Sequence, residues 1–368
     1  MLLIKNANLY SPYKMGIKDI LISGDSVEEV SENIDIQYNG VKVIDAEGEI
    51  VHPGFIDGHV HALGGGGEAG MLSRVPPLAE RRIAEAGVTT VVGLLGTDGH
   101  TRTIRDLVAK IRGYREWGLS AYCLTGSYQI PSVTLTGDVA DDIIWIDEII
   151  GVKTAISDHR CSFPETRDIL SLASKARLAS LMSKKCGIVH LHVGADERGI
   201  EQLFEIKRNT ILPIKHFYPT HMEGHMDQAK AWLEEGGHVD LTCFSDTDRK
   251  AIDLLSINSC NVTLSTDSNG SFPKWNSDRS AIIGMGAGAI SELDRYVKRM
   301  IDLGLDRQIA YKTVTENPAR AMAFDRKGRI ECGMDADIVI RDGDKIRFVI
   351  SKGAMLVSEG VAKESMYE

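Results

Sequence analysis

Eight short apolar runs follow one another through the middle of this chain of 368 residues, and each is followed by a segment with helical periodicity. This alternation is typical of βα units around a parallel sheet, and eight such units close a barrel. We therefore expect an α/β fold, a (β/α)8 TIM barrel. The runs are GFIDGHV, VTTVVGLL, SAYCLTG, GVKTAIS, GIVHLHV, IKHFYPT, HVDLTCF and NVTLSTD.

The two ends of the chain have a different pattern. Both consist of short β-like runs separated by Gly, Asp and Asn, without helical periodicity. We expect residues 1–52 and 325–368 to form a small, β-sandwich-like domain, and residues 53–324 to form the barrel.

Charge and composition narrow the range of partners. The formal net charge is −10 and no Lys/Arg-rich run occurs, which argues against nucleic acid or an anionic membrane surface as the main partner. No stretch approaches the roughly 18 apolar residues of a membrane span. The six cysteines include no C-x-x-C pair and the N-terminus is polar, so we expect a cytoplasmic protein with free thiols and a small-molecule or dipeptide substrate.

The first run ends in His59 and His61, and side chains two residues apart on a strand point to the same face. The glycines of residues 64–70 that follow match a weak dinucleotide-binding pattern. Glu68 within the loop argues against a phosphate cradle, and so does the absence of a helical start after it. A flexible turn without chemistry is a further alternative. Metal ligands elsewhere in the chain would favour a metal site.

Four further runs carry polar residues at or near the end where barrel enzymes place their chemistry. They are Lys153 in the fourth run, His192 in the fifth, His221 in the sixth and Asp267 in the eighth. A single histidine at a strand end is more often a structural, hydrogen-bonded residue. Five strands that together present nitrogen and oxygen ligands instead indicate a site for Zn²⁺ or a similar divalent ion.

A lysine within an apolar strand is unusual, because burying an ammonium group without a partner is costly. Burial lowers a lysine pKa, and a neutral amine can capture CO₂ to give a carbamate. The sequence therefore predicts N6-carboxylysine at Lys153, as a bridge between two metal ions about 3.5–4 Å apart. Such a pair can hold a hydroxide and polarise a carbonyl, which favours amide hydrolysis.

Several segments resemble the amidohydrolase superfamily, among them GFIDGHVH, TENPAR and GMDADIVI. Others resemble, in order along nearly the whole barrel, the bacterial isoaspartyl (β-aspartyl) dipeptidases: HVHALGGGGEAG, AGVTTVVGLLGTDG, CLTGSYQIPSVTLTG, IGVKTAISDHR, PTH and LSTDSNGS. The resemblance implies a homo-oligomer, an octamer, that hydrolyses the isopeptide bond of isoaspartyl dipeptides with a metal-bridging hydroxide as nucleophile. The alternatives are a dihydroorotase-like or hydantoinase-like enzyme for a cyclic amide or N-acyl amino acid, and a non-catalytic scaffold.

The resemblance also implies roles for single residues. Asp267 would act as general acid and base. Tyr128 would donate to the developing oxyanion, although without the resemblance it reads as a loop aromatic packed on the barrel rim. The two divalent ions, expected to be zinc, would be held by three sets of ligands: His59, His61 and Asp267 for one ion, His192 and His221 for the other, and carboxylated Lys153 as the bridge.

For the substrate, the resemblance implies that Glu68 grips the α-ammonium group. Arg160 would bind the C-terminal carboxylate in the bidentate manner that arginine favours; the alternative is a surface arginine beside Asp158. The candidates for the α-carboxylate of the aspartyl unit are Gly66, Thr97 and Ser271.

This chain departs from the family pattern after the sixth run. An arginine is expected three residues beyond His221, but Gly224 stands there, between Glu223 and His225. We therefore expect the leaving-group side of the pocket to accept something other than an ordinary amino acid, unless His225 supplies the second positive group.

Overall fold

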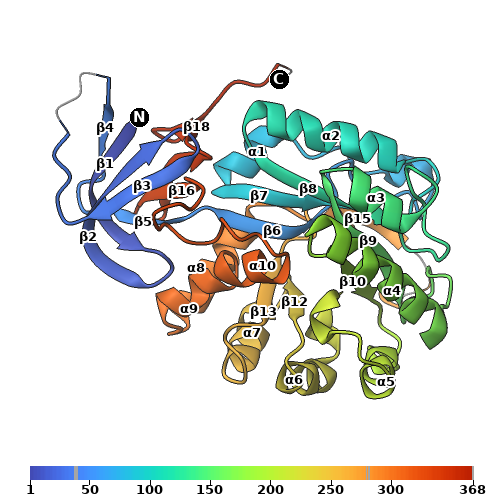
Figure 1. Ribbon diagram of the computed structural model, residues 1–368. Coiled ribbons are helices and arrows are strands. Elements are labelled where there is room, and N and C mark those ends of the chain that lie inside the picture. The colour runs from blue at the N-terminus through green and yellow to red at the C-terminus, as the bar shows by residue number, and fades with distance from the viewer. Residues whose placement is uncertain (37–39, 279, 281, 367–368) are drawn as a thin grey trace.

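A computed structural model describes residues 1–36, 40–278, 280 and 282–366 (Figure 1). All eight apolar runs form strands. In chain order they are β6 (Phe55–Val60), β7 (Val88–Gly93), β8 (Ser120–Gly126), β9 (Ile149–Ile156), β10 (Ile188–Val193), β11 (Phe217–Thr220), β12 (Val239–Thr242) and β13 (Val262–Ser265).

These strands curl into a parallel barrel. Strands β6 to β11 form one sheet in sequence order, and β12 pairs with β13 in parallel. The chain after β13 then returns to β6, where the His61 N–H donates to the carbonyl of Ser268 at 2.8 Å and Val60 bridges Ser268 in parallel. The predicted (β/α)8 architecture is confirmed.

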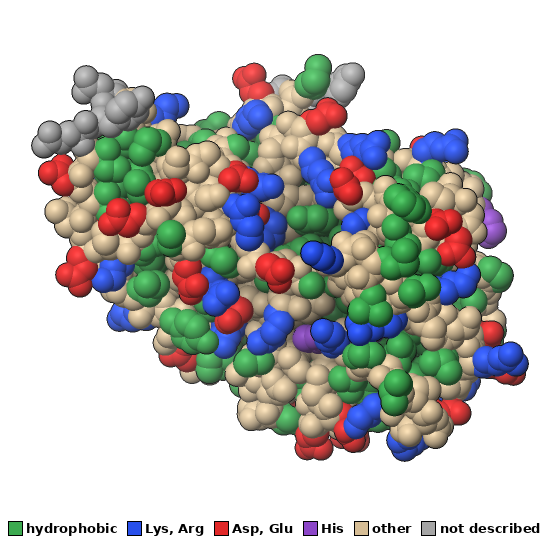
Figure 2. Space-filling view, viewed as in Figure 1, with side chains coloured by type: hydrophobic (Ala, Val, Ile, Leu, Met, Phe, Trp, Pro, Cys, Tyr) green, Lys and Arg blue, Asp and Glu red, His purple; other side chains and the backbone are tan. Residues whose placement is uncertain are grey.

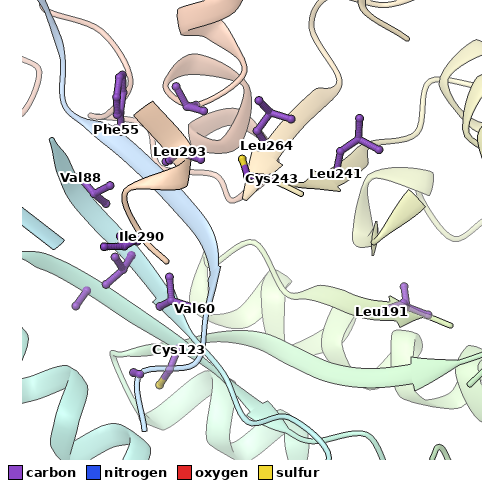
Figure 3. Packing of buried hydrophobic residues seen from close by; sticks show 14 of the residues in the cluster. Phe55, Val60, Val88, Cys123, Leu191, Leu241, Cys243, Leu264, Ile290 and Leu293 are labelled. Atoms are coloured by element: carbon purple, nitrogen blue, oxygen red, sulfur yellow. The ribbon is translucent and has the colours of Figure 1, made fainter. Parts of the chain in front are cut away.

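Helices cover the outside of this barrel (Figure 1). Those that follow the strands are α1 (Glu80–Glu85), α2 (Ile104–Trp117), α3 (Val139–Trp145), α4 (Thr166–Ser183), α5 (Glu201–Asn209), α6 (Met226–Glu234), α7 (Thr247–Leu255), α8 (Glu292–Asp302), α9 (Arg307–Lys312) and α10 (Glu316–Ala321). Figure 3 shows the apolar layer between strands and helices, where Val60 and Val88 lie near Ile290 and Leu293. None of the described helices is long and apolar enough to cross a membrane.

The two ends of the chain share a second sheet beside the barrel (Figure 1). Its described strands are β1 (Leu2–Tyr10), β2 (Lys14–Ser23), β3 (Ser26–Ser31), β4 (Lys42–Asp45), β5 (Ile50–Pro53), β16 (Ile338–Asp342), β17 (Lys345–Ser351), β18 (Ala354–Ser358) and β19 (Val361–Ala362). Antiparallel pairing of β5 with β16 joins the ends, and the sheet has an apolar cluster of its own. The division into domains at residues 52 and 325 stays a prediction.

The lower part of the barrel interior is apolar. Side chains from several strands meet Met322, which follows α10. The fit at Gly58 is tight, because a Cβ there would lie 2.6 Å from Met322 Cε. Gly58 directly precedes His59, so this apolar cluster adjoins the strand that carries the first predicted ligand. On the outer face in Figure 2, acidic and basic side chains lie among one another.

Candidate active site

A cavity of about 1210 Å³ opens at the carboxyl ends of the barrel strands. All the predicted site residues line it except His59 and Lys153, which lie deeper. Both of these are fully buried, with 1% and 0% of their surfaces exposed. The structure therefore brings the predicted residues together in one place.

The Asp267 carboxylate lies between the two histidines of the first run. Its Oδ1 is 2.9 Å from His61 Nε2 and 3.2 Å from His59 Nε2. Asp267 and His221 both have positive φ, 49° and 65°. This conformation costs energy in residues other than glycine and concentrates at functional sites.

Asp57 fixes the histidine strand to the segment that carries Asp267. Its Oδ1 accepts hydrogen bonds from the backbone N–H groups of His59 (3.1 Å) and Thr266 (3.3 Å), and its Oδ2 accepts one from the Thr266 hydroxyl (2.5 Å). The strand that carries His59 and the segment that carries Asp267 are far apart in the sequence. Asp57 holds them at the separation that binding one metal ion needs.

The donor set fits a divalent metal ion. His59, His221 and Asp267 each offer a ligand atom, and these atoms lie within 4.8 Å of one another. One buried atom nearby, His61 Nδ1, has no hydrogen-bond partner among the described residues. Imidazole nitrogens with a carboxylate oxygen are a donor set that zinc takes in proteins.

Burial also sets the protonation that metal binding requires. It lowers the pKa of His59 to about 3 and that of His192 to about 4, and it holds the pKa of His221 well below its usual value. These imidazoles are therefore neutral at neutral pH, and a neutral ring nitrogen is the form that binds metal.

Lys153 lies on β9 directly opposite His190 of β10, with 3.1 Å between Lys153 Nζ and His190 Nδ1. Burial lowers the pKa of the lysine to about 7, so about half of the amine is neutral at that pH. The sequence analysis missed His190. The available signal was its place in HLH, two residues before His192, because such a spacing puts both rings on one face.

His192 is held at both ring nitrogens. Its Nδ1 is 2.8 Å from the Tyr128 hydroxyl and its Nε2 is 2.8 Å from Asp158 Oδ2. A proton on Nε2, donated to Asp158, leaves Nδ1 with the lone pair that a metal ligand needs. Burial raises the pKa of Tyr128 well above its usual value, so this hydroxyl keeps its proton and can donate it.

Arg160 combines the two arrangements considered from the sequence. Its guanidinium forks onto Asp158, with Nε to Oδ1 at 2.9 Å and Nη2 to Oδ2 at 2.7 Å. It also lines the cavity, where Nη1 is 3.4 Å from Glu68 Oε1. The same Glu68 oxygen accepts a hydrogen bond from Ser271 Oγ at 2.8 Å.

The glycine-rich loop is anchored by a buried arginine. Arg102 donates to the carbonyls of Gly65 (2.8 Å) and Gly66 (3.1 Å), and its side chain is only 4% exposed. Gly66 has φ 77°, and a Cβ there would lie 2.3 Å from the Ser73 carbonyl oxygen. The loop carbonyls are thus committed to a buried arginine, which fixes the backbone from which Glu68 extends.

Gly224, which stands where the family pattern has an arginine, leaves open space. Nothing lies within 4 Å of the position that a Cβ would take there. His225 lines the cavity, but its Nε2 lies 2.8 Å from the Gly194 carbonyl. Glu223 is half-buried; desolvation of its carboxyl group raises its pKa to about 7, and its Oε2 accepts the Thr242 N–H at 3.2 Å.

Comparisons with known proteins agree with this geometry. The sequence pattern of the amidohydrolase family matches residues 50–362. The crystal structure of the β-aspartyl dipeptidase from Fervidobacterium islandicum AW-1 in complex with β-Asp-Leu is 39% identical to this chain. It covers 100% of both chains with a TM-score of 0.95.

Other relatives are more distant or match a shorter segment. The D-hydantoinase from Thermus sp. has a TM-score of 0.69 and 18% identity over 99% of this chain and 97% of its own, which shows a shared fold. The dihydroorotase of Staphylococcus epidermidis is 32% identical over 116 residues, which are 32% of this chain and 26% of that enzyme. The match thus spans only about a quarter of this curated relative.

Proposed function

This chain belongs to the amidohydrolase family and is a hydrolase, and from that premise we propose that it cleaves the isopeptide bond of β-aspartyl dipeptides. The observation that carries the proposal is the placement of Glu68, Arg160 and Ser271 in one cavity with a cluster of metal-ligand type. The similarity to the β-aspartyl dipeptidase over the full length of both chains supports it.

We propose that the enzyme uses two zinc ions. The residues that would hold them are His59, His61 and Asp267 for one ion, His192 and His221 for the other, and Lys153 as N6-carboxylysine between them. When bound, such a pair supplies an activated water and polarises the scissile carbonyl. The neutral imidazoles and the lowered lysine pKa support this assignment.

Two residues of the chain would then move or hold protons. Asp267 borders the cavity and would take a proton on a carboxylate oxygen, then deliver it to the leaving amine. Tyr128 would turn its hydroxyl from His192 to the carbonyl oxygen as negative charge develops there. Its raised pKa keeps the proton available for this.

The remaining residues would recognise the substrate. We assign the α-ammonium group to Glu68 and the C-terminal carboxylate to Arg160, whose Nη1 faces Glu68 while Nε and Nη2 hold Asp158. The α-carboxylate is assigned to the backbone of Gly66 and the side chains of Thr97 and Ser271, which all line the cavity.

We also propose that the enzyme works as a homo-oligomer, an octamer, in the cytoplasm. The structure holds no disulfide among the described residues, and all six cysteines are free thiols, as a reducing compartment favours. Sedimentation of the purified protein measures the assembly size directly.

The test of the function is a comparison of substrates with one preparation of defined metal content. We expect β-Asp-Leu to be hydrolysed far faster than dihydroorotate, hydantoin or N-acetyl-leucine. Acetylated β-Asp-Leu should be slower because it lacks the charge that Glu68 pairs with, a desolvated pair worth about 2–5 kcal/mol. Faster turnover of a cyclic amide would favour the dihydroorotase-like alternative, and neither metal nor turnover would favour a scaffold.

A further inference from the structure

We propose that Asp240, a carboxylate buried beneath the cavity, is a positioning residue that acts through the Thr220 hydroxyl to keep the proton of His59 on Nδ1 and so present Nε2 to a metal ion. The inference rests on the proposed metal-dependent function and assigns a role to two residues of this chain that do not touch the substrate.

Asp240 is surrounded by hydroxyl groups, and these are its hydrogen-bond donors. It is 0% exposed and accepts hydrogen bonds from Thr220 Oγ1, Ser265 Oγ and Thr263 Oγ1, each at 2.7 Å, and from Tyr218 OH at 3.0 Å. No ion pair to Asp240 occurs within the described part of the chain. Burying a carboxylate without a cation is costly. Apolar packing of the barrel interior does not require a carboxylate at this position.

The hydroxyl protons determine the direction of the hydrogen bonds. A threonine hydroxyl has one proton, and that of Thr220 is committed to Asp240 Oδ2. Its oxygen can therefore only accept from His59, whose Nδ1 lies 3.3 Å away. A proton on Nδ1 leaves the lone pair of a neutral imidazole on Nε2.

The free lone pair on His59 Nε2 faces the other residues of the metal-ligand cluster. His59 Nε2 lies 3.2 Å from Asp267 Oδ1, and with the proton on Nδ1 both atoms are acceptors. Two facing acceptors repel each other unless a cation lies between them. The chain from Asp240 through Thr220 therefore arranges His59 as a ligand before any ion arrives, and a buried hydroxyl relay protects it from competing water.

Ser265 provides an internal comparison. It donates to the same Asp240 oxygen at the same 2.7 Å as Thr220 does, but no hydrogen bond joins it to a predicted ligand in the described residues. Removing the Ser265 hydroxyl thus takes one donor from Asp240 without touching His59. A purely structural role for the network predicts similar effects at both positions.

The experiment measures the affinity for zinc alone, by competition with a chromophoric chelator, in the parent enzyme and three variants. We expect Thr220→Val, which keeps the shape and loses the hydroxyl, to weaken zinc binding roughly 10–100-fold. Thr220→Ser should restore the affinity to near the parental value, and Ser265→Ala should leave it there. Thermal unfolding of each variant checks that the fold is kept.

Parental zinc affinity in Thr220→Val, or an equal loss in Ser265→Ala, would overturn the inference while leaving the proposed function intact. A parent that binds no zinc would overturn both. A second measurement needs no variant at Thr220 or Ser265. ¹⁵N spectra of ring-labelled histidine in the chelator-treated parent determine which ring nitrogen of His59 carries the proton, and His59→Asn assigns the His59 signals. A proton on Nδ1 supports the inference, and a proton on Nε2 overturns it.

Discussion

Lys153 lies fully buried beside His190, and burial lowers the pKa of its amino group to about 7. The same physical effect that makes a lysine costly inside a barrel also makes it a nucleophile near neutral pH. The neighbouring histidines are driven to their neutral form for the same reason. At this scale, burial prepares the nitrogens of Lys153, His59 and His192 for ligand chemistry.

Replacing Lys153 by alanine should lower kcat more than roughly 100-fold, because a bridging ligand matters at least as much as the partners that orient ligands. Millimolar acetate or propionate should restore part of the activity by occupying the vacated bridging position. His59→Asn is the matched control, since it lacks an imidazole that a carboxylic acid cannot replace. Full activity of Lys153→Ala without additives would rule out the bridge.

The rate at which the metal site is rebuilt should increase with pH. CO₂ reacts with the neutral amine, which dominates above the pKa of about 7 and declines below it. Chelator-treated enzyme given zinc under one fixed partial pressure of CO₂ should therefore recover activity faster at pH 8 than at pH 6, when all samples are assayed at one common pH. The difference should shrink when CO₂ is withheld. Equal recovery at both pH values would contradict the assignment.

The loops between strands and helices carry the residues that we propose to hold the substrate. Arg102 anchors the glycine loop through the carbonyls of Gly65 and Gly66, and Asp158 holds both Arg160 and His192. Close to Asp158, His225 is bonded to the backbone of Gly194. The element after β11 therefore braces a neighbouring loop, and Gly224 leaves space where a longer side chain would reach the cavity.

Gly224→Arg should lower KM for β-Asp-Leu about tenfold, because a charge-assisted hydrogen bond to the C-terminal carboxylate is worth roughly 1.5–3 kcal/mol and adds ground-state binding. It should change KM for β-Asp-Leu-amide much less. Gly224→Met controls for size without charge. If the arginine variant improves acid and amide equally, the added group does not face the substrate carboxylate.

For the whole molecule, the joint between the terminal sheet and the barrel carries a buried ion cluster. Lys327 Nζ lies 2.9 Å from Asp335 Oδ2 and 2.7 Å from Asp337 Oδ2, and it donates to Ser120 Oγ of β8 at 2.8 Å. Its side chain is 3% exposed. This lysine therefore ties the C-terminal segment to a barrel strand.

Lys327→Met should lower the free energy of unfolding by about 3–5 kcal/mol, because it leaves the buried Asp337 carboxylate without its cation and Asp335 with only the half-exposed Arg326. Arg329→Met is the control: Arg329 pairs with Glu331 at the surface, where such a pair is worth about 0–1 kcal/mol. Denaturant unfolding measures both, and the folded Lys327 variant should keep its kcat. An unchanged midpoint for Lys327→Met would contradict a structural role of the cluster.

Sequence alone determined those features that depend on local periodicity. The alternation of apolar runs with helical segments predicted the barrel, and the spacing of two placed His59 and His61 on one face. The strand ends indicated where Lys153, His192, His221 and Asp267 would meet, because parallel strands in a barrel share one carboxyl edge.

Tertiary structure decided which side chains on separate strands touch. The contact of Asp158 with His192, the contact of His190 with Lys153 and the hydroxyl cluster around Asp240 depend on strand register and loop backbone. Asp240 also lies in an apolar run, that of β12, but its hydrogen-bond partners lie on the two neighbouring strands β11 and β13. Register and closure of the barrel are collective properties of all its strands, so no local pattern encodes those contacts.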